Sequence, residues 1–261
     1  MPDIGTEKPR LLLDIDGVLH VGEAPLPGAV DALVALRDLT AGIRLITNTT
    51  SKPRAAIVER LRRMGFRIAE DEVITPAATA LALCSERGFE RVLLLVPEGL
   101  REDLAGLLEP APDRRPEAVI LGDLGESFTA SVLNEAFRAL LEGAELVALQ
   151  HNRYWRSGEG MVMDVGAYAA ALEYAADVEA IVVGKPSPQL FEAALCRIPG
   201  TGRALMVGDD IEGDIGGALG AGLDAILVRT GKYRSEAVAA SGIEPTATID
   251  SIAALPQLLT Q

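Results

Sequence analysis

The strongest constraint on the fold of this 261-residue chain is a series of short apolar runs, in which apolar residues follow one another instead of alternating with polar ones. Such runs are typical of strands buried on both faces, as in a parallel sheet with helices on each side. Helix-like segments separate the runs, so each strand is expected to lead into a crossover. The main sheet is predicted from residues 10–14, 43–47, 180–184, 204–208 and 225–228, with a short last strand at 248–250. The sequence therefore predicts an α/β protein with a doubly wound, Rossmann-like core.

A block in the middle of the chain has its own alternation of strands and helices. Strands are predicted at 91–96, 118–121 and 146–149, and helices at 131–142 and 166–174. This repeated pattern of buried apolar strands and helical crossovers indicates a second α/β module. We therefore predict a core domain formed by residues 1–79 and 179–261, into which residues 80–178 are inserted as a separate domain.

Charge and composition exclude several functions. The chain has 38 acidic and 24 basic residues, a formal charge of −14, which argues against nucleic-acid binding and against adsorption to anionic membranes. No apolar run approaches the roughly 18 residues of a membrane span. The first ten residues include acids and two prolines, unlike a secretory signal, so a cytoplasmic location is expected. Cys84 and Cys196 lie in no metal-ligand spacing, and both are expected to be buried small apolar residues.

Polar residues of particular kinds end four of the predicted core strands. They are Asp14 and Asp16, then Thr47, then Lys185, then Asp209 and Asp210, with Asp214 four residues later. Ligands of open parallel sheets bind beyond the carboxyl ends of the strands, so these side chains are expected to converge in one crevice. Crowded carboxylates repel one another, and a hard divalent cation with oxygen ligands relieves that repulsion. Mg²⁺ suits such a site and commonly bridges to a substrate phosphate.

Positive groups for a phosphate are also present in this predicted crevice. The hydroxyl of Thr47 and the ammonium of Lys185 can hold phosphate oxygens. A helix is expected to start just after each of them, and helix N-termini carry partial positive charge. The predicted site therefore surrounds a phosphoryl group with positive potential inside an acidic protein.

These segments, in this order, resemble the haloacid dehalogenase (HAD) superfamily of phosphotransferases. The matching motifs are Asp14-Ile-Asp-Gly-Val-Leu19, Thr47-Asn48, Gly184-Lys185-Pro186 and Gly208-Asp209-Asp210. The inserted module resembles the large α/β (C2) cap of the NagD-type branch. Several segments, among them Arg229-Thr-Gly-Lys-Tyr233, are similar to the HDHD-two-like and phospholysine phosphohistidine inorganic pyrophosphate phosphatase subgroup. Mammalian members of that subgroup carry serine at the position of Asp16, so the aspartate here favours an ordinary acid/base mechanism.

The resemblance implies a role for each motif residue. Asp14 would attack phosphorus and form an aspartyl-phosphate, while Asp16 would act as general acid and then general base. The metal would be held by Asp14, Asp209 and the backbone carbonyl of Asp16. The phosphate-binding residues implied are Thr47, Asn48, Thr49 and Lys185. Asp210 and Asp214 would support the metal or orient Lys185, although both could instead be helix-capping or helix-surface carboxylates.

A cluster in the predicted cap is rich in groups that recognise ligands. His151, Tyr154 and Trp155 follow a predicted cap strand. In the NagD-type branch the corresponding loop faces the leaving group, so these residues are candidates for specificity, with ordinary cap packing as the alternative. Closure of such a cap would exclude water from the first step.

The function expected from this reasoning is a Mg²⁺-dependent phosphatase of small phosphorylated metabolites. The bond cleaved would be a phosphoric monoester, with phosphoramide and pyrophosphate substrates left open. The alternatives are a phosphotransferase or phosphomutase on the same scaffold, and a non-catalytic phosphate-binding regulator. The expected partners are a small phosphorylated substrate and, by resemblance, a second copy bound through the cap, with neither nucleic acid nor membrane.

Overall fold

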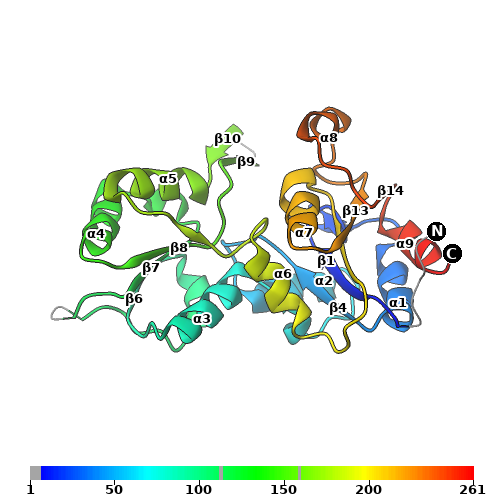
Figure 1. Cartoon of the computed structure of the whole chain (residues 1–261), viewed down its shortest axis with the longest axis horizontal. Helices are drawn as coiled ribbons and strands as arrows, with labels where there is room; N and C mark the ends of the chain where they lie inside the picture. Colours follow the sequence, from blue (N-terminus) through cyan, green and yellow to red (C-terminus); the bar gives the residue numbers. More distant parts are fainter. Residues whose placement is uncertain (1–6, 112–113, 158–159) are drawn as a thin grey trace. The chain divides into compact units, whose positions relative to one another are not determined.

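The computed structural model describes residues 7–111, 114–157 and 160–261, without the side chains of residues 155–157. The chain divides into two compact units (Figure 1). The first, here the core unit, consists of Met1–Thr47, Ala55–Ile74 and Lys185–Gln261. The second, here the inserted unit, consists of Asn48–Arg54 and Thr75–Gly184. Each unit is built around its own parallel sheet, so the predicted α/β fold class is confirmed.

Within the described residues, the sheet of the core unit has six strands in the order β14-β13-β12-β1-β4-β5, and every neighbouring pair is parallel. The strands are β1 (Arg10–Asp14), β4 (Gly42–Ile46), β5 (Val73–Ile74), β12 (Ala204–Gly208), β13 (Asp224–Val228) and β14 (Ala247–Ile249). A short antiparallel hairpin, β2 (His20–Val21) and β3 (Ala24–Pro25), follows β1. The central strands β1 and β12 lie side by side, so the chain segments that follow Asp14 and Gly208 emerge at the same edge.

One strand predicted for the core sheet belongs elsewhere. The segment 180–184 contains β11 (Ile181–Val182), which pairs with β8 (Glu145–Ala148) in the sheet of the inserted unit. The segment 180–184 therefore contributes no strand to the core sheet. The edge strand β5 was not predicted, because two residues are too few to show a periodic pattern. An apolar run predicts a buried strand but does not specify the sheet that it joins.

Helices cover both faces of the core sheet. They are α1 (Ala29–Leu39), α2 (Arg54–Arg63), α6 (Pro188–Leu195), α7 (Gly217–Gly220), α8 (Ser235–Ser241) and α9 (Leu255–Leu259). Leu11 and Leu13 of β1 pack in the same apolar cluster as α1 and α9, whereas Leu12 packs with α6 and α7. Successive residues of β1 therefore point into opposite apolar layers, which explains why its sequence is an unbroken apolar run.

In the part of the inserted unit that the structure describes, a four-stranded parallel sheet has the order β11-β8-β7-β6. Its further strands are β6 (Val92–Leu95) and β7 (Ala118–Leu121), and a hairpin of β9 (Tyr154–Ser157) and β10 (Gly160–Met163) lies apart from it. The helices are α3 (Pro76–Arg87), α4 (Ala130–Leu141) and α5 (Val165–Ala176). Short 3-10 helices cover Glu70–Glu72, Glu98–Leu104, Gly125–Ser127 and Ile252–Ala254 along the chain.

The two cysteines differ in environment. Cys84 of α3 is buried, as predicted, whereas Cys196 is exposed, so the prediction for Cys196 was wrong. Cys196 stands at the C-terminal cap of α6, one residue beyond the last residue of the helix. Among the described residues, none of the helices has both the length and the apolar character to cross a membrane.

Candidate active site

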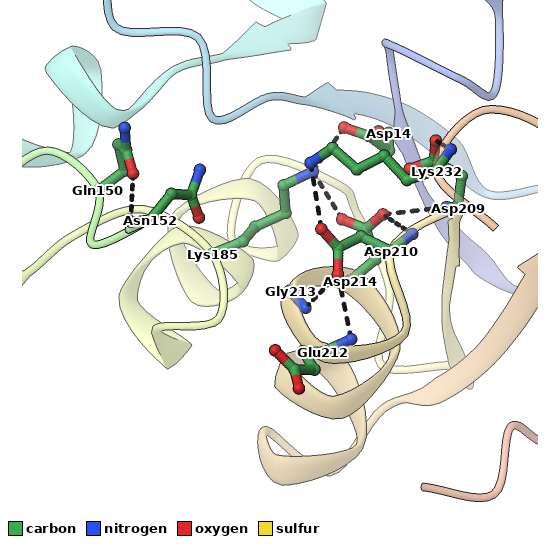
Figure 2. A network of polar contacts seen from close by, with 10 residues as sticks. All are labelled: Asp14, Gln150, Asn152, Lys185, Asp209, Asp210, Glu212, Gly213, Asp214 and Lys232. Atoms are coloured by element: carbon green, nitrogen blue, oxygen red, sulfur yellow. Dashed lines mark hydrogen bonds and ion pairs between the residues drawn. The ribbon is translucent and has the colours of Figure 1, made fainter. Parts of the chain in front are cut away.

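The neighbouring strands β1 and β12 deliver two buried carboxylates to one edge of the core sheet. Asp14 is the last residue of β1, and Asp209 follows directly after β12. Asp214 comes from the turn of π-helix Ile211–Gly216 and is buried as well. Carboxylate oxygens of these three aspartates all lie within 4.8 Å of one another, the one such acidic cluster found among the described residues (Figure 2). The structure thus brings Asp14 and Asp209 together as the sequence predicted.

Lys185 lies in the middle of this acidic cluster. Its Nζ is 2.5 Å from Asp14 Oδ1 and 2.7 Å from Asp214 Oδ1, and all three side chains are buried (Figure 2). Burial opposes the charged form of Lys185, but the carboxylates of Asp14 and Asp214 raise its pKa, so it remains an ammonium. Burial also raises the pKa of Asp14 well above its usual value, assisted by Asp214 and Asp209 and opposed by Lys185. The ammonium therefore favours the ionised form of a carboxylate that burial disfavours.

The pKa of Asp209, the second carboxylate at this edge of the sheet, is also raised. Burial, and next the charge of Asp214, raise the pKa of Asp209 to about 7. The main-chain N–H of Lys232 donates to Asp209 Oδ2 at 2.7 Å and opposes this shift. A raised pKa in a buried cluster of acids indicates that the site lacks positive charge.

This donor set fits a divalent cation. The ammonium of Lys185 pairs with two of the three clustered carboxylates, and these four groups together carry a net charge of −2 when all of them are ionised. Carboxylate oxygens at the carboxyl ends of parallel strands are the ligands that Mg²⁺ prefers. A cation held by Asp14 and Asp209 would balance that charge and return the pKa values of both groups toward the usual range.

Asp210 and Asp214 have distinct structural roles. Asp210 caps the turn that follows it, because its Oδ1 accepts from the amides of Glu212 at 3.1 Å and Gly213 at 3.0 Å (Figure 2). Its Oδ2 lies 3.1 Å from Lys232 Nζ. Asp214 Oδ2 accepts from the amides of Asp209 and Asp210, at 3.0 and 3.1 Å, while its Oδ1 faces Lys185. Asp214 is therefore a buried member of the cluster rather than a carboxylate on the surface of a helix.

The contact between Lys232 and Asp210 was not predicted from the sequence. Burial opposes the charged form of Lys232, but the carboxylate of Asp210 raises its pKa. Burial would raise the pKa of Asp210, but its pKa is lowered, first by the ammonium of Lys232 and then by the amide of Gly213. In the sequence, the segment 229–233 contributed to the family resemblance, but no contact with the site was expected from it. Its place at the carboxyl end of β13, beside β12, is the signal that could have connected it with the site.

Asp16 and Thr47 lie in the same unit but differ in exposure. The side chain of Asp16 is 58% exposed, and its carboxylate is not part of the acidic cluster; its Oδ1 lies 3.6 Å from Nε2 of the buried His20. Thr47 is buried directly after β4, and its N–H donates to the carbonyl of Ile74 at 3.3 Å. Asn48 belongs to the inserted unit, where its Oδ1 lies against Gly184, and Thr49 belongs to the same unit.

The candidates for specificity in the inserted unit lie around the hairpin of β9 and β10. His151 Nε2 is 3.4 Å from Glu173 Oε2, and Tyr154 is 57% exposed. The side chain of Trp155 lies outside the described residues. A buried pair that was not predicted stands at the base of the hairpin: Gln150 donates to Asp164 Oδ1 and accepts from the amide of Asn152 at 2.5 Å (Figure 2).

Comparison with protein families agrees with the fold. The chain belongs to the haloacid dehalogenase-like hydrolases: one model, described as haloacid dehalogenase-like hydrolase, matches residues 11–107. A second HAD-hydrolase-like model matches residues 182–255. The matched ranges contain all four of the motifs on which the predicted resemblance was based.

Two human proteins are similar over most of the chain. The chain is 42% identical over 229 residues to haloacid dehalogenase-like hydrolase domain-containing protein 2 of Homo sapiens, covering 86% of this chain and 85% of that protein. It is 39% identical over 258 residues to phospholysine phosphohistidine inorganic pyrophosphate phosphatase of Homo sapiens, covering 96% of this chain and 94% of that protein.

Solved structures of similar fold include enzymes with named activities. A glycerol phosphate phosphatase from Mycobacterium tuberculosis, in complex with magnesium, has a TM-score of 0.85 at 30% identity, covering 99% of this chain and 80% of that one. NagD from Escherichia coli K-12 has a TM-score of 0.83 at 25% identity, covering 95% and 98%. These similarities confirm the predicted superfamily and its NagD-type branch.

Proposed function

We propose that this protein is a Mg²⁺-dependent phosphatase of small phosphorylated metabolites that works through an aspartyl-phosphate on Asp14. The observation that carries the proposal is the buried Asp14 carboxylate, ion-paired with Lys185 and clustered with Asp209 and Asp214. The names of its relatives, which include a phosphohistidine and a glycerol phosphate phosphatase, support the same reaction class.

The proposed first step is attack of an Asp14 carboxylate oxygen on phosphorus. The bond between phosphorus and the leaving-group oxygen breaks, and Asp16 gives its proton to that oxygen. In the second step water attacks the same phosphorus, and Asp16 takes the proton of the water. The bond between phosphorus and Asp14 breaks, which releases inorganic phosphate and restores the carboxylate. The exposure of Asp16, beside the buried nucleophile in sequence, suits a group that must reach both a leaving group and water.

Charge on the transferred phosphoryl oxygens is balanced by groups held in place before the reaction. Lys185 provides a fixed ammonium, and the hydroxyl of Thr47 with Asn48 and Thr49 would provide hydrogen-bond donors. Because such groups are already oriented, they stabilise the transition state without reorganisation. Asp14, Asp209 and the carbonyl of Asp16 would hold Mg²⁺, with Asp214 and Asp210 in support. The ion supplies further positive charge to the phosphoryl oxygens.

We also propose that residues 80–178 act as the cap of a core formed by residues 1–79 and 179–261. His151, Tyr154 and Trp155 are the residues that we expect to contact the leaving group.

We further propose that the cap binds a second copy of itself. The exposed apolar side chains Met161 and Met163 on β10 would suit burial against that second copy. Sedimentation equilibrium of the native chain tests that association, and a monomer at all concentrations would contradict it.

The proposed activity is tested with 4-nitrophenyl phosphate. We expect phosphate release with Mg²⁺, loss of release with a chelator, and loss of release in Asp14→Asn. Asp31→Asn, an exposed acid in the first turn of α1, is the matched control and should behave as the unaltered protein. Equal release under all of these conditions would overturn the proposal. A panel of phosphorylated metabolites would then identify the substrate class.

A further inference from the structure

The turn after β13 contacts two parts of the proposed active site at once. The main-chain N–H of Lys232 donates to Asp209 Oδ2 at 2.7 Å. Two residues earlier, the hydroxyl of Thr230 donates to the carbonyl of Gly17 at 2.5 Å, in the loop that follows Asp14. The turn Thr230–Gly231–Lys232 therefore links Asp209 to the loop of the nucleophile, and none of these residues was assigned a role from the sequence.

The two loops can meet only because glycine stands on each side of Asp209. Gly17 has φ +84° and Gly231 has φ +59°, and a Cβ added at either position would lie 1.8 Å from Asp209 Oδ2. A Cβ on Gly231 would also lie 2.6 Å from the Cα of Gly17. Both values are far below van der Waals contact, so the Asp209 carboxylate is enclosed between two stretches of main chain and oriented by the Lys232 amide.

We propose that the turn Thr230–Gly231–Lys232 is a positioning element for metal binding, and that Thr230 is its positioning residue. The inference rests on the proposed function, because it takes Asp209 as a metal ligand. The hydroxyl of Thr230 holds the turn against the Gly17 carbonyl, and this contact sets the Lys232 amide at hydrogen-bond distance from Asp209. Groups that orient a ligand in this way typically change metal affinity about 10–100-fold when removed.

The Thr230 hydroxyl is the part of this turn that can be removed with least disturbance. Thr230→Val keeps the shape of the side chain but loses the hydrogen bond to Gly17, and Thr230→Ser keeps the hydroxyl. Changing Lys232 would break its ion pair with Asp210 and would not remove the main-chain amide. Thr40→Val is the matched control, because the buried Thr40 hydroxyl also donates to a main-chain carbonyl, that of Leu36 at 2.8 Å, at the end of α1.

The experiment has one readout with metal and one without. Mn²⁺ binding to the intact chain is measured by electron paramagnetic resonance, and exchange of the Lys232 amide is measured by NMR in metal-free buffer. In Thr230→Val we expect Mn²⁺ affinity to fall about tenfold and the Lys232 amide to exchange at least about tenfold faster, since a bond that protects it is loosened. Thr230→Ser and Thr40→Val should match the unaltered protein in both measurements.

Each outcome bears on the inference. Unchanged amide exchange in Thr230→Val would overturn it, and so would faster exchange with unchanged Mn²⁺ affinity. If Thr230→Val does not fold, Thr230→Ala takes its place with the same expectations. If the unaltered protein binds no Mn²⁺, the metal part of the proposed function fails and this inference fails with it. If it binds Mn²⁺ but hydrolyses no phosphate ester, the proposed activity fails while the role of Thr230 in metal binding stands.

Discussion

Lys185 Nζ lies 2.5 Å from Asp14 Oδ1, although 171 residues of sequence separate the two. The contact joins the end of β1 to the segment in which the chain returns to the core unit. It favours the ionised form of the proposed nucleophile, because the ammonium opposes the rise that burial causes in the pKa of Asp14.

Removing this ammonium should affect both stability and turnover. We expect Lys185→Met to lower kcat for 4-nitrophenyl phosphate at least about 10²-fold, as loss of a fixed charge-stabilising group does elsewhere. Breaking a buried ion pair costs about 3–5 kcal/mol, less where a remaining carboxylate takes up a proton. Stopped assays and urea unfolding measure the two effects. Lys8→Met, which changes an exposed lysine bonded to the carbonyl of Asp38, should alter neither, and an active Lys185→Met would contradict the role given to Lys185.

Thr47 should contribute to rate more than to stability. In Thr47→Val we expect kcat/KM to fall about 10²-fold, the usual cost of one lost donor to a reacting oxyanion. Thr47→Ser keeps the donor and should retain most of the rate. Thr79→Val removes a buried hydroxyl bonded to the carbonyl of Thr75 and serves as the control for fold. If both valine variants show the same kcat/KM, then Thr47 has no special part in phosphate binding.

The ion pair of Arg37 and Glu72 should make stability depend on pH. Burial of Glu72 opposes ionisation, but the guanidinium of Arg37 and the amide of Ala69 lower its pKa below the usual 4.5. A carboxyl whose pKa is lowered on folding stabilises the protein above its unfolded pKa, and this contribution is lost as the pH falls through the folded pKa. We expect Glu72→Gln to cost about 0.5–1 kcal/mol at pH 7, given the partial exposure of Arg37.

Urea unfolding between pH 7 and pH 4 measures this difference. It should be full above the usual pKa of 4.5 and begin to shrink below it, because the unfolded chain then binds a proton at Glu72 before the folded protein does. Asp71→Asn, an exposed acid in the same turn, should show no comparable loss. A constant difference across the range would indicate that Glu72 acts through packing rather than through its charge.

The two cysteines should react at very different rates. Burial raises the pKa of the Cys84 thiol to about 11, whereas Cys196 is exposed. Only a thiolate is nucleophilic, so a disulfide reagent at pH 8 should label Cys196 quickly and Cys84 slowly in the native protein. In urea both thiols should react. Mass spectrometry of the labelled peptides identifies the sites, and rapid native labelling of Cys84 would show that α3 opens readily.

Much of the site was predictable because one rule of parallel sheets applies to it. Asp14 and Asp209 each end an apolar run, and neighbouring parallel strands bring their carboxyl ends to the same edge. Asp214 was left open between two roles, since nothing in the sequence indicates the π-helical turn that directs it inward. Lys232 was missed because its role depends on contacts with Asp209 and Asp210 across the sheet. Local periodicity failed for β5, whose two residues leave no pattern to detect. The apolar run at 180–184 did predict the strand β11, but nothing in the run indicates that it pairs with β8.

The close approach of Gly17 and Gly231 to Asp209 has a consequence for how this protein can vary. Every missense change in a glycine codon introduces a side chain with at least a Cβ. Any amino-acid substitution at Gly17 or Gly231 therefore places an atom against the Asp209 carboxylate. In a random library selected for activity, both codons should remain glycine. Gly220 should drift freely by contrast, because an added Cβ there meets no heavy atom of the described residues within 4 Å.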